Sequence, residues 1–334
     1  MGPSNRNDPL DDTATAEPGP RIAVLAPSPQ LVVEIVDEPE REGNEGHPTI
    51  HLHPGGQGAW VASMAVALGA DVVLSAPLGG ELGEPLRRLL IAAGITVKDG
   101  GDGPGTGASV VDLRGEDRVT IANMPSPPLG RHEVDDYYGV ALVDALESDA
   151  AIVTGVDPPE LLSPEFFGRL VADVRAANIP VVADVAADVA LAVIREGPTV
   201  LKISHEETLA VGLAKDDALG TLRTTAEKLV ADGVGAVVIS RAEKPALLVT
   251  SDGARLFAAP SVSTVMHRGA GDSMTAGIAV GIARGMSIED ALRLGAAAGA
   301  LNVARHGLGS GRREQIERFA EQIEVSDANV DGSA

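Results

Sequence analysis

Residues 180–204 read PVVADVAADVALAVIREGPTVLKIS and carry the clearest sign of the chain's architecture. Two apolar runs, Pro180–Val185 and Val200–Ile203, have the length and the Val and Ile content of buried strands. The residues between them are rich in Ala and Leu at helical spacing. A crossover of that length suits a helix, and a helix between two strands places them parallel in one sheet. The stretch therefore predicts a strand–helix–strand unit.

The same alternation continues in both directions along the chain. Strand-like runs lie at Ile22–Ala26, Val72–Ala76, Ala151–Thr154 and Ala236–Ser240. Helical patterns cover Ala59–Leu68, Glu84–Ala93, Glu133–Leu146, Pro164–Ala177 and Thr221–Ala231. Because most of the strands are followed by a helix, we expect an α/β fold with a parallel sheet and helices on both of its faces.

Two pairs of strand-like runs break this rhythm. One pair is Leu31–Val36 and Thr49–His53, and the other is Ala108–Leu113 and Val119–Asn123. Each pair is joined by a short polar segment, which predicts antiparallel ribbons over about 31–54 and 106–124 that project from the main sheet. A small attached sheet can serve as a lid that excludes water, or it can decorate an edge, and spacing alone leaves both readings open.

The composition excludes several classes of protein. The 334 residues include 26 Lys and Arg against 48 Asp and Glu, a formal net charge of −22, which argues against binding to nucleic acid phosphates. Aromatic residues make up only 2%, too few for a base-stacking platform. Hydrophobic residues make up 44%, enough for a large core.

The chain has no cysteine, which removes disulfides, thiolate metal sites and a cysteine nucleophile together. This composition suits a cytoplasmic protein. No apolar run approaches the roughly 20 residues needed to cross a bilayer. Residues 1–20 lack the basic start and apolar stretch of a signal peptide, and we expect residues 1–20 and 325–334 to be disordered tails.

The strongest glycine-rich turn is Gly269-Ala270-Gly271-Asp272, which directly opens an amphipathic pattern. Glycines let the backbone approach an anion, and the free amides at a helix start favour a phosphate or a developing negative charge. Asp272 lies at that same helix start. A carboxylate facing an anion site suggests a base that takes a proton from an attacking hydroxyl, although Asp is also a common helix cap.

Two further glycine clusters are less decisive alone. Gly55 and Gly56 precede a helical pattern, and they permit either close approach of a ligand hydroxyl or a tight turn. Gly307 and Gly309 lie between two C-terminal helical patterns, where they can border a nucleotide base or cap a helix. The phosphate-binding run G-x-x-x-x-G-K-[ST] is absent, which excludes a P-loop enzyme.

The motifs GAGDSMTAG at 269–277 and GGQGAWVASMAVALGADV at 55–72, in this order, resemble the ribokinase-like (PfkB) carbohydrate kinase family. The resemblance covers residues 21–320. It leans toward the branch of 1-phosphofructokinase and tagatose-6-phosphate kinase. It implies a three-layer α/β/α body with a small β-sheet lid, and transfer of the γ-phosphoryl group of ATP to a hydroxyl of a sugar, phosphosugar or sugar-like acceptor. A homodimer through the lid is also implied.

The resemblance assigns roles to particular residues of this chain. It implies Asp272 as the catalytic base, an anion hole at Gly269, Ala270 and Gly271, and Glu207 as a residue that holds Mg²⁺ through water. Nucleotide-binding positions are Lys202, Ser204, Ser240, Asn302, Gly307 and Gly309, and substrate-binding positions are Gly55, Gly56, Gln57, Trp60 and Val32.

Several residues depart from the family's pattern. Val32 stands where the family has a sugar-binding Asp, Gln57 where it has Lys, and Trp60 where it has Asn. An Arg of the lid is also missing at Gly107, so two cations that bind an acceptor's phosphate in that branch are absent. Two alternatives therefore stay open: a nucleoside kinase, and a catalytically impaired relative that binds a nucleotide or metabolite in a regulatory role.

Overall fold

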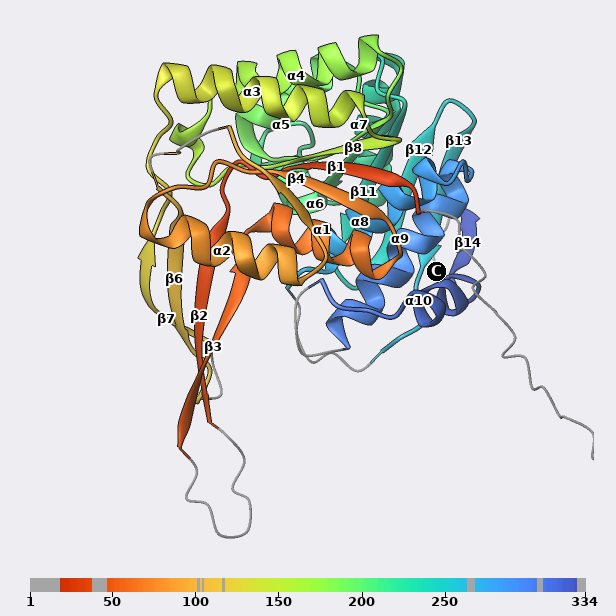
Figure 1. The fold of residues 1–334 in the computed structure, drawn as a ribbon. Coiled ribbons are helices and arrows are strands. Elements are labelled where there is room, and N and C mark those ends of the chain that lie inside the picture. The colour runs from red at the N-terminus through yellow and green to blue at the C-terminus, as the bar shows by residue number, and fades with distance from the viewer. Residues whose placement is uncertain are drawn as a thin grey trace, which may run out of the picture.

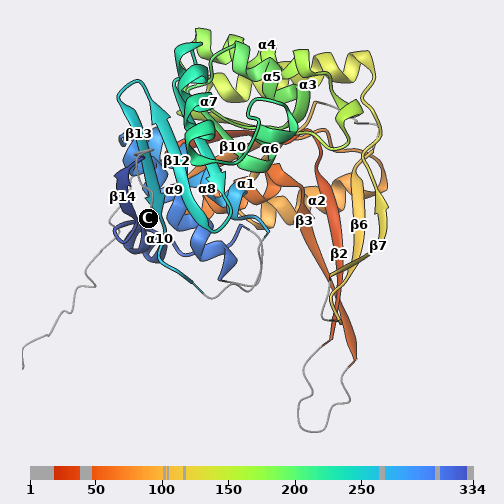
Figure 2. The ribbon, with the colours of Figure 1, turned by 180° about the vertical axis from the view of Figure 1, so that it is seen from behind.

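The computed structural model describes residues 19–37, 47–100, 103, 105–115, 118–262, 268–304 and 309–328. A large twisted sheet runs through the body with helices on both faces, and a second, smaller sheet projects from one end (Figures 1 and 2). This is the three-layer α/β/α arrangement with an attached small sheet that the sequence predicts.

The large sheet has ten strands in the order β14-β13-β12-β11-β10-β9-β8-β1-β4-β5. Strands from β5 to β11 are parallel, and the three beyond β11 are antiparallel. The strands are β1 (Arg21–Leu25), β4 (Asp71–Ser75), β5 (Thr96–Lys98), β8 (Ala150–Thr154), β9 (Val181–Asp184), β10 (Val200–Ser204), β11 (Ala236–Arg241), β12 (Lys244–Thr250), β13 (Gly253–Ala258) and β14 (Glu324–Asp327).

Helices cover both faces because the strands are apolar on both faces. In β1, Ile22 and Val24 join one buried cluster, while Ala23 and Leu25 join the other. The first cluster takes in α1 (Gln57–Ala67), α2 (Gly80–Ala92), α8 (Ala270–Ala283), α9 (Ile288–Val303) and α10 (Arg313–Ala320). The second takes in α3 (Arg131–Leu146), α4 (Pro164–Ala176), α5 (Ala187–Arg195) and α7 (Leu219–Ala231). The short helices α6 (His205–Ala210) and η1 (Pro159–Leu161) follow β10 and β8. In the described ranges, no helix combines the length and the apolar character that crossing a bilayer requires.

The predicted strands and helices of the body are confirmed, with ends that move by a few residues. The predicted C-terminal tail is wrong at its start, because β14 (Glu324–Asp327) pairs antiparallel with β13. Val325 packs on the first cluster, Ala328 is buried, and Arg255 pairs with Asp327. The segment is polar, so its side chains do not show the apolar pattern of a buried strand. It still forms an edge strand, because the backbone hydrogen bonds that pair it with β13 do not depend on side-chain polarity. The remainder of the predicted tails, residues 1–18 and 329–334, lies outside the described residues.

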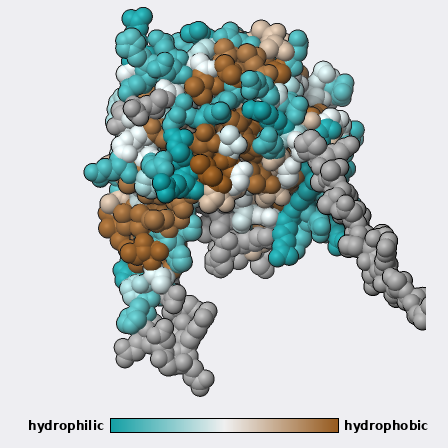
Figure 3. All heavy atoms as spheres, viewed as in Figure 1, coloured by the Kyte–Doolittle hydropathy of each residue, from teal (hydrophilic) through white to brown (hydrophobic). Residues whose placement is uncertain are grey.

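The second sheet has the order β3-β2-β6-β7. Its strands are β2 (Gln30–Asp37), β3 (Pro48–Gly55), β6 (Gly107–Asp112) and β7 (Val119–Met124). Both predicted ribbons are present, and parallel pairing of β2 with β6 joins them. Large apolar side chains are exposed here, and Figure 3 shows an apolar patch over this sheet. They are Ile50, Leu52, Val119, Ile121 and Met124.

Candidate active site

Polar side chains gather where the parallel strands of the large sheet end. The register sets Thr154 of β8 beside Asp184 of β9, and Asp184 beside Lys202 of β10. At the next pair of strands, Ser204 lies beside Ser240 of β11. Ligands of open α/β sheets bind at this carboxyl edge. The structure therefore brings Lys202, Ser204 and Ser240 of the predicted set to one edge.

Helix α8 begins at the same edge, in contact with β8 and β9. Its N-cap Gly269 has φ +78°, a left-handed conformation that favours glycine. The first amide bonded back along the helix is that of Ser273, which donates to the Gly269 carbonyl at 2.9 Å. The amides of Ala270, Gly271 and Asp272 come before it and, as at every helix start, have no acceptor within the helix.

Beneath this turn lies a buried cluster of three side chains. Lys202 Nζ donates to both carboxylate oxygens of Asp184, at 3.0 and 3.1 Å, and the Thr275 hydroxyl donates to Asp184 Oδ2 at 2.7 Å. A Cβ on Gly271 would lie 2.7 Å from Lys202 Nζ, so the ammonium group lies directly against the backbone of the turn. The absence of a side chain at Gly271 thus leaves this cation close to the free amides.

Lys202 keeps its charge at this depth. Burial by itself lowers the pKa of Lys202, but the charges of Asp184, Glu207 and Asp272 outweigh burial and hold the pKa above its usual value. The ammonium group therefore adds a positive charge to the dipole at the start of α8.

Asp272 lies in the first turn of α8 and is partly buried. Burial raises the pKa of its carboxyl to about 7, and the charge of Asp184 adds to the rise. The charge of Lys202 and the side-chain amide of Gln57 lower this pKa, while the charge of Glu207 raises it further. A carboxyl with a pKa near neutral is a better base than one at its ordinary value, because its affinity for a proton matches the working pH.

Gln57, the first residue of α1, reaches across to the ends of β8 and β9. Its Oε1 accepts from the Gly155 amide at 2.8 Å, and its Nε2 donates to the Asp184 carbonyl at 3.2 Å. The same side chain also lowers the pKa of the Asp272 carboxyl. The residue that the sequence assigns to the substrate is therefore held among protein groups.

Ser204 and Glu207 form a capping box at the start of α6. Ser204 Oγ accepts from the Glu207 amide at 3.1 Å, and Glu207 Oε2 accepts from the Ser204 amide at 2.7 Å. Ser204 thus caps the start of α6. The pattern Ser-x-x-Glu was readable in the sequence as this motif.

The carboxylate of Glu207 fits a Mg²⁺ ion that takes most of its ligands from water and substrate. Glu207 Oε1 makes no hydrogen bond to any described residue, so one carboxylate oxygen is available. Within the described ranges no group of three or more His, Asp and Glu side chains converges to hold a metal ion. Mg²⁺ commonly binds through one or two carboxylates plus substrate phosphates, so such a cluster is not required.

Asn302 and Gly309 join the C-terminal segments to α1 and α8. The Asn302 side chain is buried, donates to the Arg268 carbonyl at 2.8 Å and accepts from the Gly309 amide at 3.0 Å. A Cβ on Gly309 would lie 2.5 Å from the carbonyl oxygen of Trp60, so this position accepts only glycine without movement. Gly307, the other predicted glycine here, lies outside the described residues.

The predicted substrate residues lie where the second sheet joins α1. Gly55 ends β3, and Gly56 is the N-cap of α1. Val32 is buried, and its Cγ2 lies 2.3 Å from where a Cβ of Gly55 would be. Val32 therefore packs on the turn where the family has a hydroxyl-binding carboxylate.

Two arginines of the second sheet already have carboxylate partners. Arg114 binds Asp112 through two nitrogens, at 2.6 and 2.9 Å. Arg118 binds Glu34 at 3.1 Å, and His53 lies 3.3 Å from the same carboxylate. Because each of these guanidinium groups is already paired with a carboxylate, they do not replace the missing Lys and Arg as binding groups for an acceptor's phosphate.

Two residues of the buried cluster, Asp184 and Thr275, are not among those predicted from the sequence. A signal for Asp184 existed, because a lysine inside the buried run VLKIS must find a carboxylate, and Asp184 ends the preceding strand. No comparable signal exists for Thr275, whose partner lies 91 positions away along the chain.

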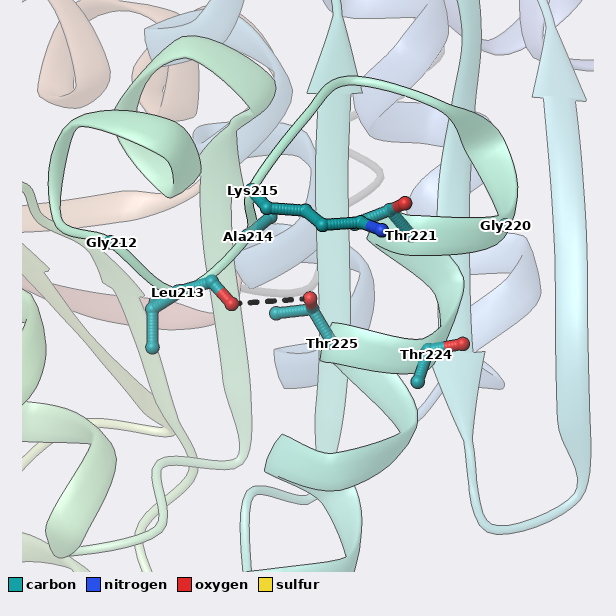
Figure 4. A pocket seen from close by; sticks show the side chains of 8 residues that line it. All are labelled: Gly212, Leu213, Ala214, Lys215, Gly220, Thr221, Thr224 and Thr225. Atoms are coloured by element: carbon teal, nitrogen blue, oxygen red, sulfur yellow. Dashed lines mark hydrogen bonds between the residues drawn. The ribbon is translucent and has the colours of Figure 1, made fainter.

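A hollow of about 680 Å³ lies elsewhere, between α6 and α7 (Figure 4). Thr225 Oγ1 donates to the Leu213 carbonyl at 3.3 Å across it. None of the predicted site residues lines this hollow, whose walls are Gly212, Leu213, Ala214, Lys215, Gly220, Thr221, Thr224 and Thr225.

Comparisons with solved structures agree with this fold. Phosphofructokinase-2 from Escherichia coli, in complex with substrates and products, matches with a TM-score of 0.75 at 23% identity, covering 90% of this chain and 99% of that one. Ribokinase from Thermotoga maritima matches with a TM-score of 0.67 at 20% identity, covering 90% and 99%. At these identities the likeness shows a ribokinase-like fold.

Sequence relatives lead to the same family. The ATP-dependent 6-phosphofructokinase isozyme 2 of Mycobacterium tuberculosis is 29% identical over 320 residues, 93% of this chain and 92% of that protein. The 1-phosphofructokinase of Escherichia coli is 26% identical over 310 residues, 92% and 99%. The profile described as pfkB family carbohydrate kinase matches residues 30–315. Since that match spans most of the 334 residues, the chain belongs to the pfkB family of carbohydrate kinases.

Proposed function

We propose that this carbohydrate kinase transfers the γ-phosphoryl group of ATP to a hydroxyl of a sugar-type acceptor at the start of α8, with Asp272 as the general base. The observation that carries the proposal is the position of Asp272. Its carboxyl, with a pKa of about 7, lies in the same helical turn as the free amides of Ala270 and Gly271. A proton acceptor and an anion site are thereby held side by side.

The chemistry divides between these groups. The Asp272 carboxylate takes the proton of the acceptor hydroxyl as the hydroxyl oxygen bonds to the γ-phosphorus. The bond from that phosphorus to the oxygen that bridges the β- and γ-phosphates breaks, and ADP leaves. The amides at Gly269, Ala270 and Gly271, with the Lys202 ammonium below them, stabilise the negative charge that develops on the transferred phosphoryl. Phosphoryl transfer depends mainly on positioning and charge stabilisation, which is what such a turn supplies.

Glu207 is proposed to hold Mg²⁺ through water, using the oxygen that the capping box leaves available. When bound, Mg²⁺ would neutralise charge on the substrate phosphates. For the nucleotide we propose the carboxyl-edge residues Lys202, Ser204 and Ser240, with Asn302, Gly307 and Gly309 bordering the base. Asn302 acts in this proposal by holding the segments at Arg268 and Gly309, since its amide is already bonded to both.

The test of the base is Asp272→Asn in an assay that couples ADP formation to an optical signal. We expect kcat to fall by about 10²–10⁴-fold, the usual contribution of a general base. In the wild type kcat should rise with pH through about 7, because the base must be ionised. Asp188→Asn, a change at an exposed first-turn aspartate of α5, is the matched control. Full activity of Asp272→Asn would contradict the assignment.

The acceptor is to be found by screening sugars, sugar phosphates and nucleosides in the same assay. Turnover of a sugar or sugar phosphate supports the leading proposal, and turnover only of nucleosides supports the nucleoside kinase. Calorimetry that shows tight nucleotide binding without turnover of any acceptor would instead favour the regulatory alternative.

We also propose that the chain forms a homodimer through the second sheet. The support is the exposed apolar patch of Ile50, Leu52, Ile121 and Met124, since exposed apolar surface of this kind marks an interaction site. A cytoplasmic location stays a prediction from the cysteine-free composition.

A further inference from the structure

Thr275, in the second turn of α8, links that helix to strand β9. Its side chain is fully buried, and its hydroxyl donates to Asp184 Oδ2 at 2.7 Å. Asp184 is the last residue of β9 and is buried as well. A hydrogen bond to a carboxylate is stronger than one between neutral groups, because the acceptor carries a charge. The first turns of α8 are therefore held to the sheet by a buried polar contact.

The same hydroxyl also lies close to the glycine-rich turn. Thr275 Oγ1 is 3.0 Å from the carbonyl oxygen of Gly271, four residues earlier in α8. A hydroxyl carries a single hydrogen, so it donates to one of these two acceptors at a time. A hydroxyl that serves only its own helix bonds the carbonyl four residues earlier, as Ser63 does with Ala59 at 2.8 Å. The shorter distance to Asp184 indicates a role that reaches beyond the helix.

These contacts close a ring around Gly271. Asp184 leads to Lys202, whose Nζ donates to both carboxylate oxygens at 3.0 and 3.1 Å. Lys202 leads back to the turn, since a Cβ on Gly271 would lie 2.7 Å from Nζ. A lysine side chain is long and flexible, so the carboxylate of Asp184 decides where the ammonium group lies. The Thr275 hydroxyl, in turn, fixes the rotation of that carboxylate.

We propose that Thr275 is a positioning residue, whose hydroxyl orients Asp184 and thereby holds the Lys202 ammonium group against the turn that opens α8. The inference rests on the proposed function of that turn in phosphoryl transfer. Without the hydroxyl, α8 stays packed on α1 and α9. Among the described side chains, however, Asp184 then keeps Lys202 alone as a donor, and the positive charge is free to move away from the amides.

Three substitutions separate this role from a contribution to the fold. Thr275→Val replaces the hydroxyl with a methyl group of similar size, and Thr275→Ser keeps the hydroxyl. Thr225→Val is the matched control, because Thr225 lies in the second turn of α7 and its hydroxyl donates to the Leu213 carbonyl at 3.3 Å, beside the hollow that no predicted site residue lines (Figure 4). Urea denaturation establishes that each variant is folded.

The first measurement needs no turnover. It is a proton–nitrogen-15 NMR spectrum of the lysine ammonium groups in the full chain. Lys202 is buried, so its ammonium signal should be visible, and Lys202→Arg identifies the signal by removing it. We expect this signal to shift in Thr275→Val and to stay in place in Thr275→Ser and Thr225→Val. The other lysines are exposed and exchange their ammonium protons rapidly with water; they are Lys98, Lys215, Lys228 and Lys244.

The second measurement is kinetic. We expect kcat of Thr275→Val to fall by up to about 100-fold with KM for ATP and for the acceptor little changed, as misplacement of a group in the site does. Thr275→Ser should recover most of this loss, and Thr225→Val should keep the wild-type kcat.

An unmoved Lys202 signal in Thr275→Val, or a normal kcat of that folded variant, would overturn the proposal. If Asp272→Asn is inactive while Thr275→Val is not, the proposed function stands and this inference alone is rejected. If the wild type turns over no acceptor, a shifted Lys202 signal in Thr275→Val would retain the positioning role and reject the proposed function.

Discussion

The carboxyl edge of the large sheet and the second sheet treat charged groups in opposite ways. At the edge, the side chains of Lys202 and Asp184 are 7% and 3% exposed and are satisfied by each other and by Thr275. In the second sheet, the His53 and Glu34 side chains are 51% and 20% exposed, so water can solvate much of that pair. The charged side chains at the edge are buried, whereas those of this pair in the second sheet are partly exposed to solvent.

This difference in burial indicates which of the two regions tolerates substitution of its charged residues. A buried charge that loses its partner is strongly destabilising, so residues at the edge are tied to one another and to the fold. Exposed ion pairs contribute about 0–1 kcal/mol, so exposed charged residues of the second sheet can change with little effect on stability. The candidate site thus joins an edge whose charges are tied to the fold to a second sheet whose exposed charges can vary.

The largest effect is expected for Lys202→Met. The substitution leaves the Asp184 carboxylate buried with only Thr275 as a side-chain partner. We expect the free energy of unfolding to fall by about 3–5 kcal/mol, the cost of breaking a buried pair on one side. Urea denaturation followed by circular dichroism measures this. Lys215→Met, at an exposed lysine, should change stability by less than about 0.5 kcal/mol. Equal small changes in both variants would show that the buried Lys202–Asp184 pair contributes no more to stability than an exposed lysine does.

A smaller effect, of opposite sign, is expected for Asp272→Asn. The folded-state pKa of Asp272 lies at about 7, above its unfolded value, so the folded protein holds a proton that the unfolded chain has released between about pH 4 and 7. Stability contributed by that proton is present below about pH 4 and is lost as pH rises to 7. At pH 8 the variant should be more stable than wild type by about 1–4 kcal/mol.

Urea denaturation between pH 5 and 8 tests this, because the advantage of the variant should shrink as pH falls. A variant that is less stable than wild type at pH 8 would show that Asp272 supports the fold. Asp272→Asn is therefore expected to gain stability and to lose turnover, which is the combination expected for a catalytic group that destabilises the fold.

The smallest effect on stability is expected for Leu52→Glu in the second sheet. Leu52 is 49% exposed, so a carboxylate there meets water in the monomer, and stability should change by less than about 0.5 kcal/mol. In the proposed dimer the same carboxylate would be buried, so sedimentation velocity should show monomers. Val143→Glu, at a 53% exposed position on α3, should leave the dimer intact. A dimeric Leu52→Glu protein would place the interface elsewhere.

The apolar runs of the body were predictable because buried parallel strands need Val and Ile on both faces, a property that a short window of sequence displays. Val200–Ile203 is such a run, and it becomes β10. The start of α8 was predictable for a similar reason, since Gly269 and Asp272 lie within one turn. The edge strand β14 was not, because its partner strand β13 precedes it by more than sixty residues and its own composition is polar.

The sequence alone determined the layered α/β architecture, the glycine-rich turn that opens α8 and the carboxylate within it, because each depends on neighbours a few residues apart. Only the tertiary structure decided what surrounds that carboxylate. Gln57 lies 127 positions before Asp184, and Thr275 lies 91 positions after it, yet both bond to that residue. The pKa of Asp272 arises from burial and charge among such distant residues, which no local pattern in the sequence records.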